Sequence, residues 1–124
     1  MASLNKVIIA GRLTRKPELR RTPNGISVTD LLLALNREFV TVAGERQQEV
    51  CFVDVVVWGK QAEACCHSLD SSSPVLVEGR LQLDTWHGKD GDKRSKLRVA
   101  AERVQFLDRK MALEREQEEA PASR

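Results

Sequence analysis

Residues 50–58 (VCFVDVVVW) impose the strongest constraint on the fold, because their apolar side chains alternate in the pattern of a strand. Successive side chains of a strand point to opposite faces of the sheet. One face of this segment is wholly apolar and is assigned to the core: Cys51, Val53, Val55 and Val57. The other face comprises Phe52, Asp54, Val56 and Trp58. The segment therefore predicts a strand that directs two aromatic rings away from the core.

Four further strands are predicted over residues 4–14, 26–38, 75–86 and 96–107. Gly11 within the first suggests a bulge or bend, and residues 22–25 (TPNG) predict a turn before the second. Each strand has an apolar face, whose members are Val7, Ile9, Gly11 and Leu13, then Leu31, Leu33 and Leu35, then Val75, Val77, Gly79, Leu81 and Leu83, then Leu97, Val99 and Ala101. In the last strand Val104 and Phe106 are out of phase with Leu97, which predicts a bulge near Glu102–Arg103.

A single short helix is predicted between the third and fourth strands, over residues 59–69. Its apolar side consists of residues at helical spacing: Ala62, Cys65, Cys66 and Leu69. Five strands with one helix in this position indicate an all-β, five-stranded OB-fold barrel over residues 1–108. A generic α+β sheet is the alternative. Residues 109–124 are expected to form a short, charged, disordered C-terminal tail.

The composition agrees with one soluble domain in a reducing compartment. The 124 residues fit a single domain and contain no apolar run of the roughly 20 residues that a transmembrane helix needs. The first twelve residues lack the features of a signal peptide. Three cysteines, two of them adjacent, are not the pattern of a disulfide framework or a zinc site. We therefore expect a cytoplasmic protein.

The charge is balanced overall but unevenly distributed. Residues 6–21 carry six bases and one acid, residues 80–103 carry seven bases and four acids, and residues 37–54 carry two bases and four acids. The two basic stretches could form one positive surface if the fold brings them together. A solvated surface of mixed charge is the alternative.

Catalysis, a metal and a cofactor find no support in the sequence. The two histidines, His67 and His87, lie 20 residues apart in unlike settings. Helical spacing places Cys65 and Cys66 near the core, which argues against a metal site with His67. The glycines lack the Lys-Ser/Thr spacing of a phosphate-binding loop. We predict a protein that is not an enzyme and has no catalytic residue, metal or cofactor.

The aromatic residues give a more specific indication. The chain has only three Phe and two Trp, so aliphatic side chains must fill the core. Alternation directs Phe52, Trp58 and Trp86 to the faces opposite the core, and Phe39 begins a loop. Exposed rings near basic hairpins suit single-stranded nucleic acid, because bases stack on the rings while Lys and Arg follow the phosphates. Packing at a barrel end or between subunits is the alternative.

Several segments together resemble the bacterial single-stranded DNA-binding protein family. These segments are residues 5–13 (NKVIIAGRL), 18–25 (ELRRTPNG), 59–64 (GKQAEA), 78–81 (EGRL) with Trp86, and 104–108 (VQFLD). The resemblance covers about residues 3–108 in the same order. It implies an OB-fold, usually a homotetramer, that binds single-stranded DNA in replication, recombination and repair without strong sequence preference.

The resemblance also implies roles for individual residues. Four aromatics stand at or near the family's base-stacking positions: Phe39, Phe52, Trp58 and Trp86. Six bases are the expected phosphate contacts: Arg12, Arg20, Arg21, Lys60, Arg80 and Arg94. Arg80 could instead serve subunit packing. Phe106 is expected in the core or in a subunit interface.

The chain departs from the family pattern in three places. Val53 and Asp54 follow Phe52, where the family commonly has a His and a base, so tetramer geometry is in doubt and Asp54 is expected to repel phosphate. Asp84 and Thr85 precede Trp86, where the family often has bases. The last residues (EREQEEAPASR) lack the family's acidic, enzyme-recruiting tip, so such recruitment is not predicted. We expect weaker DNA binding per site than is usual for the family.

Two other roles remain open on the same fold. A primosomal replication-restart OB protein, which binds DNA and protein, is favoured by the missing acidic tip but not by the aromatic residues. A structural OB oligomer that binds protein would bury the aromatics between subunits. RNA is a further possible ligand, because stacking does not by itself distinguish ribose from deoxyribose.

Overall fold

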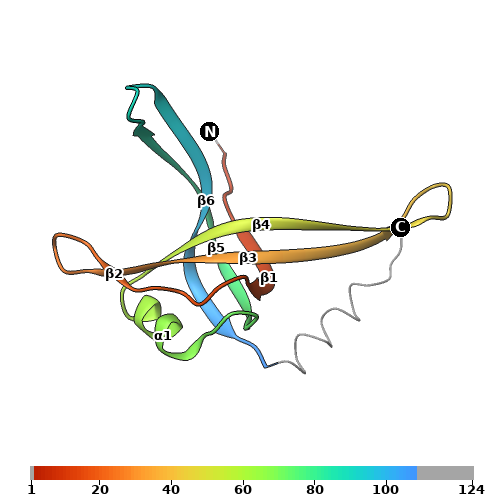
Figure 1. The fold of residues 1–124 in the computed structure, drawn as a ribbon, viewed down its shortest axis with the longest axis horizontal. Helices are drawn as coiled ribbons and strands as arrows, with labels where there is room; N and C mark the ends of the chain where they lie inside the picture. Colours follow the sequence, from red (N-terminus) through yellow and green to blue (C-terminus); the bar gives the residue numbers. More distant parts are fainter. Residues whose placement is uncertain (1, 109–124) are drawn as a thin grey trace.

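The computed structural model describes residues 2–108 and contains six strands and one helix (Figure 1). Along the chain these are β1 (Val7–Leu13), β2 (Arg20–Arg21), β3 (Ser27–Val40), β4 (Arg46–Trp58), α1 (Lys60–Ser68), β5 (Pro74–His87) and β6 (Lys93–Phe106). The predicted order is confirmed, with the two-residue β2 added ahead of the second long strand. The predicted tail at 109–124 lies outside the described residues.

The strands form one sheet that closes into a barrel. The sheet order is β1-β5-β6-β4-β3-β2, and a further pairing of β1 with β3 closes five of these strands into the predicted OB-type barrel. Gly11 lies where β1 passes from β5 to β3. A Cβ atom at Gly11 would lie only 2.7 Å from the carbonyl oxygen of Ala34, so the residue type permits the close approach that closes the barrel.

The predicted turn and bulge are both present. Gly25 has a φ of 82°, and its N–H donates to the carbonyl oxygen of Thr22 at 2.8 Å, which forms the turn of residues 22–25. In the β5–β6 ladder, Glu78 is opposite Arg103 whereas Gly79 is opposite Ala101. Glu102 is therefore the additional residue of a β-bulge, at the position that the change of phase predicted.

The core is aliphatic. The barrel strands contribute Leu13, Leu31, Leu33, Val55, Val57, Val75, Val77 and Val99, and α1 and the residue after it add Ala62, Cys65 and Leu69. Cys66, expected on the apolar side of the helix, is only half-buried. Within residues 2–108, no helical segment has the length and apolar character that a membrane span requires.

Two hairpins extend beyond the barrel as arms (Figure 1). The β3–β4 arm ends in the turn around Gly44, and the β5–β6 arm ends in the turn around Gly91. In the first arm, β3 continues to Val40 and β4 begins at Arg46, so both strands extend closer to the turn than the predicted bounds of 38 and 50. Phe39, which was expected to begin a loop, is therefore paired within β3, opposite Gln47.

The arms correct part of the predicted core. Cys51, Leu81, Leu83 and Leu97 have the same alternation as the core residues of their strands, but Cys51 is exposed and the three leucines are 48–62 % exposed. The reason is that these positions lie on the arms, where the opposite wall of the barrel no longer covers the face. Phe106, expected in the core or an interface, is 40 % exposed in this chain.

Candidate nucleic-acid interface

One face of the curved sheet lies opposite the core and carries most of the predicted site. We call this the outer face, formed by Arg20 of β2, by the even-numbered residues of β3, β4 and β5, and by those of β6 as far as Ala100, beyond which the bulge at Glu102 changes the alternation. Strand pairing aligns its residues in rows across the sheet. Arg20 is opposite Val28, which is opposite Trp58. A second row joins Arg80, Ala100 and Val56.

Three predicted stacking residues share this outer face. Phe52 and Trp58 lie on β4, and Trp86 lies near the tip of the β5–β6 arm. Their side chains are 62 %, 46 % and 44 % exposed. Val28, Val56 and Ala100 form a small buried cluster on the same face, and Val28 is the cross-strand neighbour of Trp58. The three rings are therefore open to a ligand.

Phe39 lies apart from these three aromatics. It is on the β3–β4 arm opposite Gln47, and its odd position places it on the other side of the ribbon from Phe52. The guanidinium of Arg37 lies 4.8 Å from the centre of its ring, within cation–π range. Arg37 also pairs with Glu49 at 3.0 Å. One face of the Phe39 ring is therefore already in use.

The predicted phosphate contacts fall into two groups. Arg12, Arg20, Arg80 and Arg94 adjoin the outer face: Arg12 is opposite Ala34, the cross-strand neighbour of Phe52, and Arg94 is opposite Trp86. Arg12 also donates to the carbonyl oxygen of Ser72 at 3.4 Å. The other group, Arg21 and Lys60, lies elsewhere.

Arg21 and Lys60 occupy a different part of the surface. Arg21 is opposite Ser27 and donates to its Oγ at 3.3 Å, and Ser27 in turn donates to Glu63 of the helix at 3.1 Å. Lys60 begins α1 and is exposed. These two bases therefore flank the helix end of the barrel rather than the aromatic face.

Two further bases of β6, Lys96 and Arg98, lie on the outer face. The sequence patterns place them in a basic stretch but do not single them out as phosphate contacts. Alternation could have identified them, since both are out of phase with Leu97 and Val99. Lys96 donates to the carboxylate of Asp54, the residue expected to repel phosphate, so that carboxylate is paired.

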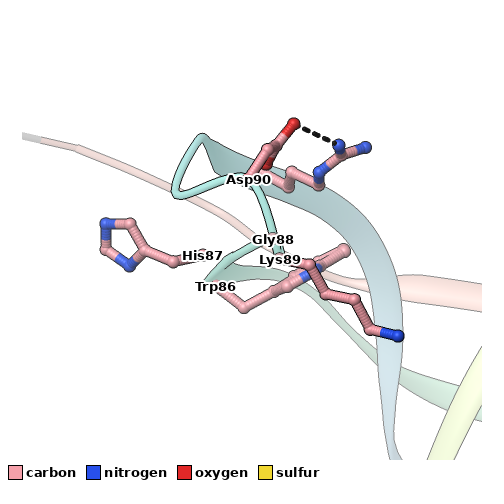
Figure 2. A pocket seen from close by; sticks show the side chains of 6 residues that line it. Trp86, His87, Gly88, Lys89 and Asp90 are labelled. Carbon is pink, nitrogen blue, oxygen red and sulfur yellow. Dashed lines mark hydrogen bonds and ion pairs between the residues drawn. The ribbon is translucent and has the colours of Figure 1, made fainter.

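The tip of the β5–β6 arm contains an open hollow of about 610 Å³ (Figure 2). Trp86, His87, Gly88, Lys89, Asp90 and Arg94 line it. In this view the side chains of Trp86 and Lys89 extend in one direction, whereas His87 extends in the other. The hollow brings together the ring of Trp86, the cations Lys89 and Arg94, and the carboxylate of Asp90.

Asp90 is held in its charged form at this tip. Its Oδ1 accepts the backbone N–H of Asp92 at 3.1 Å and its Oδ2 accepts Arg94 at 3.2 Å. Both hydrogen bonds lower the pKa of Asp90, and the one from the backbone of Asp92 contributes most. Arg94 is therefore partly neutralised where it meets the hollow.

Among residues 2–108, no group of three or more His, Cys, Asp or Glu side chains is arranged to hold a metal ion. Burial, with a smaller contribution from Cys66, raises the pKa of Cys65 to about 11, which keeps that thiol protonated at neutral pH. The notable chemistry of the described chain is therefore the aromatic and charged outer face.

Residues 4–107 match the model of the Single-strand binding protein family. The chain is 45% identical over 106 residues to a single-stranded DNA-binding protein of Helicobacter hepaticus, a match that covers 86% of this chain and 62% of that protein. It is 43% identical over 111 residues to single-stranded DNA-binding protein 2 of Chlorobaculum tepidum, covering 89% and 75%. The chain thus spans about three fifths to three quarters of the length of these relatives.

Two solved structures are similar in fold. A deletion mutant of the single-stranded DNA binding protein from Thermus aquaticus superposes with a TM-score of 0.77 at 36% identity, over 86% of this chain and 51% of that one. The Plasmodium falciparum SSB in complex with ssDNA has a TM-score of 0.80 at 22% identity, over 87% and 98%. The second likeness concerns the fold alone.

Proposed function

The chain belongs to the single-strand binding protein family, and on that basis we propose that it binds and protects single-stranded DNA without catalysing a reaction. The observation that carries this proposal is the placement of three exposed rings, Phe52, Trp58 and Trp86, on one face of the barrel. Rings stack on any base, so binding is largely independent of sequence. The proposed role is in DNA replication, recombination and repair in the cytoplasm, associated with the nucleoid and without a cofactor.

Each ring and base has a proposed part in holding the strand. Phe52, Trp58 and Trp86 stack on bases across the outer face, and Phe39 offers its remaining ring face to a base on the β3–β4 arm. Lys and Arg neutralise the phosphates, and our proposed contacts are Arg12, Arg20, Arg21, Lys60, Arg80 and Arg94. These four aromatic residues and six bases make up the proposed site.

We also propose that the chain assembles as a homo-oligomer, a tetramer as in the family or a dimer. The support is the exposed apolar surface that Leu81, Leu83 and Leu97 form on the β5–β6 arm, where Leu83 is opposite Leu97. Exposed apolar side chains gathered in this way are typical of a protein contact. This surface lies on the side of the arm opposite Trp86, so a subunit could cover it while the aromatic ring stays free.

A titration with oligo(dT) tests the DNA-binding proposal. The fluorescence of Trp58 and Trp86 should be quenched as the strand binds, and affinity should fall as salt rises because counterions are released from the phosphates. A parallel mass measurement gives the oligomeric state. Absence of quenching and of binding at low salt would contradict the proposal and favour a protein-binding OB oligomer with buried rings.

Two further experiments distinguish the remaining roles. Titration with oligo(U) of equal length reports whether RNA binds as well as DNA, since the stacking residues do not themselves select the sugar. A pull-down with a replication-restart helicase tests the primosomal role. Capture of such a helicase together with weak oligo(dT) binding would favour that alternative.

A further inference from the structure

Three acids and three bases of the outer face form ion pairs with one another. Three carboxylates, which we call the carboxylate set, come from three different strands: Asp30 of β3, Asp54 of β4 and Asp84 of β5. Three bases, which we call the inner bases, come from the strands beside them: Arg20 of β2, and Lys96 and Arg98 of β6.

Each inner base already has a carboxylate partner. Arg20 Nη2 donates to Asp30 Oδ2 at 2.8 Å, and Lys96 Nζ donates to Asp54 Oδ2. Arg98 lies between two acids, with its Nε 3.0 Å from Asp84 Oδ2 and its Nη1 3.6 Å from Asp30 Oδ1. Gln82 donates to the second oxygen of Asp84 at 2.8 Å, which holds that carboxylate in place.

These pairs are partly withdrawn from water. The side chains of Asp54, Asp30 and Arg98 are 15 %, 28 % and 26 % exposed, whereas those of Lys96 and Arg20 are 49 % and 56 % exposed. Salt screens such pairs less than it screens fully exposed ones. Arg98 Nε and Asp30 Oδ1 are buried without a hydrogen-bond partner, so charge rather than aligned hydrogen bonds holds this guanidinium. The inner bases are therefore neutralised by the protein itself.

A base that is already neutralised contributes little to the binding of a polyanion. Counterions leave single-stranded nucleic acid only when a free positive charge replaces them at the phosphates. A neutral ion pair offers no such charge, and a phosphate that takes the base sets a carboxylate free beside it. The inner bases should thus add to neither the affinity nor its salt dependence.

We propose that the carboxylate set masks Arg20, Lys96 and Arg98 from the DNA backbone, which removes Arg20 from the six phosphate contacts proposed above. The outer face then binds the DNA strand mainly through stacking on Phe52, Trp58 and Trp86. The phosphates are then neutralised by bases other than the inner bases. Among them, Arg80 and Lys60 make no ion pair with another residue of the described chain. This inference rests on the proposed function and names the residues that limit the affinity for single-stranded DNA.

The pair of Asp54 and Lys96 provides a direct test in the full chain. Asp54→Asn removes the mask without changing the size of the side chain and leaves Lys96 free. Binding of fluorescein-labelled oligo(dT) is measured by anisotropy over a series of salt concentrations. We expect roughly two- to fivefold tighter binding at low salt, from the worth of an exposed ion pair. We also expect the slope of log K against log salt to steepen by about 0.7, the value for one additional phosphate contact.

The double variant Asp54→Asn/Lys96→Gln separates masking from an ordinary contact. It replaces a neutral pair by two neutral side chains, so a masked Lys96 predicts wild-type affinity and an unchanged slope. If Lys96 instead contacts phosphate in the wild-type protein, the double variant binds more weakly and its slope falls by about 0.7. That result would overturn the proposal.

Asp92→Asn is the matched control, because it removes one negative charge from the exposed turn of the β5–β6 arm, the arm that carries Lys96, at a position where no ion pair within the described residues holds the carboxylate. It should change affinity less than twofold and leave the slope unaltered; an effect equal to that of Asp54→Asn would also overturn the proposal. Should Asp54→Asn not fold, Asp84→Asn frees Arg98 from its nearer carboxylate and should likewise steepen the slope. If the wild-type chain does not bind oligo(dT), the proposed function fails first and this inference fails with it. If the wild-type chain binds and the slopes do not change, only the masking is wrong.

Discussion

Replacement of Trp86 by Ala tests whether the outer face holds bases by stacking. Trp86 lies near the tip of the β5–β6 arm, opposite Arg94, and lines the open hollow there (Figure 2). Its side chain is 44 % exposed and belongs to neither buried cluster. The substitution should therefore change the free energy of unfolding by no more than about 1 kcal/mol, as at other surface positions.

The expected effect on binding is much larger. Stacking of one base on an aromatic side chain contributes roughly 1–3 kcal/mol. At 25 °C this corresponds to an increase in the Kd for oligo(dT) of about 5- to 150-fold. Phe39→Ala should cost less, because Arg37 already occupies a position 4.8 Å from the centre of the Phe39 ring and leaves only one ring face free.

Fluorescence anisotropy with labelled oligo(dT) at one fixed salt concentration measures both variants. Thermal unfolding followed by circular dichroism shows whether each variant remains folded. If the Kd of Trp86→Ala stays within twofold of wild type, the ring does not stack on a base. A loss of affinity that is matched by a large drop in Tm would instead assign Trp86 to packing.

Three further perturbations test the fold, the assembly and the buried thiol. Gly79→Ala would place a Cβ atom 2.1 Å from the carbonyl oxygen of Ala100, so β6 would have to move at the bulge. We expect the free energy of unfolding to fall by about 3 kcal/mol and the Tm to fall by about 10 °C or more. An unchanged melting curve would contradict the bulge geometry. Leu83→Asp places a charge in the exposed apolar surface of the arm and should yield smaller, folded species in sedimentation experiments, whereas an unaltered mass would show that this surface is not the subunit contact. At pH 8 a thiol reagent should label exposed Cys51 and leave Cys65 unlabelled until the chain unfolds. Because the pKa of Cys65 is raised from 9.0 to about 11, the contribution of this thiol to stability should be complete below pH 9 and should decline as the pH rises towards 11. Unfolding in denaturant at several pH values measures this decline. A Cys65→Ala variant should lack this part of it.

Local patterns in the sequence were enough to predict the elements of this protein and their order. The alternation of residues 50–58 identified the strand that supplies Val55 and Val57 to the core. The change of phase before Val104 located the bulge at Glu102, and the spacing of Ala62, Cys65 and Leu69 identified the buried side of the helix region. These features depend on residues close together in the chain, so period and turn chemistry are sufficient to reveal them.

The tertiary structure decided where each strand leaves the barrel. Alternation distinguishes the two faces of a strand, but it does not show how far a face is covered by another part of the chain. Val77 and Leu83 share a face of β5, yet Val77 is buried and Leu83 is exposed, because only the first lies within the closed barrel. The sequence therefore predicted core positions in both hairpins, at Cys51 and at Leu81, Leu83 and Leu97, that the structure leaves exposed.

The tertiary structure also decided which charges meet. Asp30, Asp54 and Asp84 come from three strands that are far apart in the sequence, and Lys96 and Arg98 lie on the strand between two of them in the sheet. Ion pairs between such residues depend on strand order and register, which a single sequence does not specify. The sequence alone therefore determined the strands, their faces and the exposed aromatic rings. The pairing of strands determined that Arg20, Lys96 and Arg98 are paired with carboxylates.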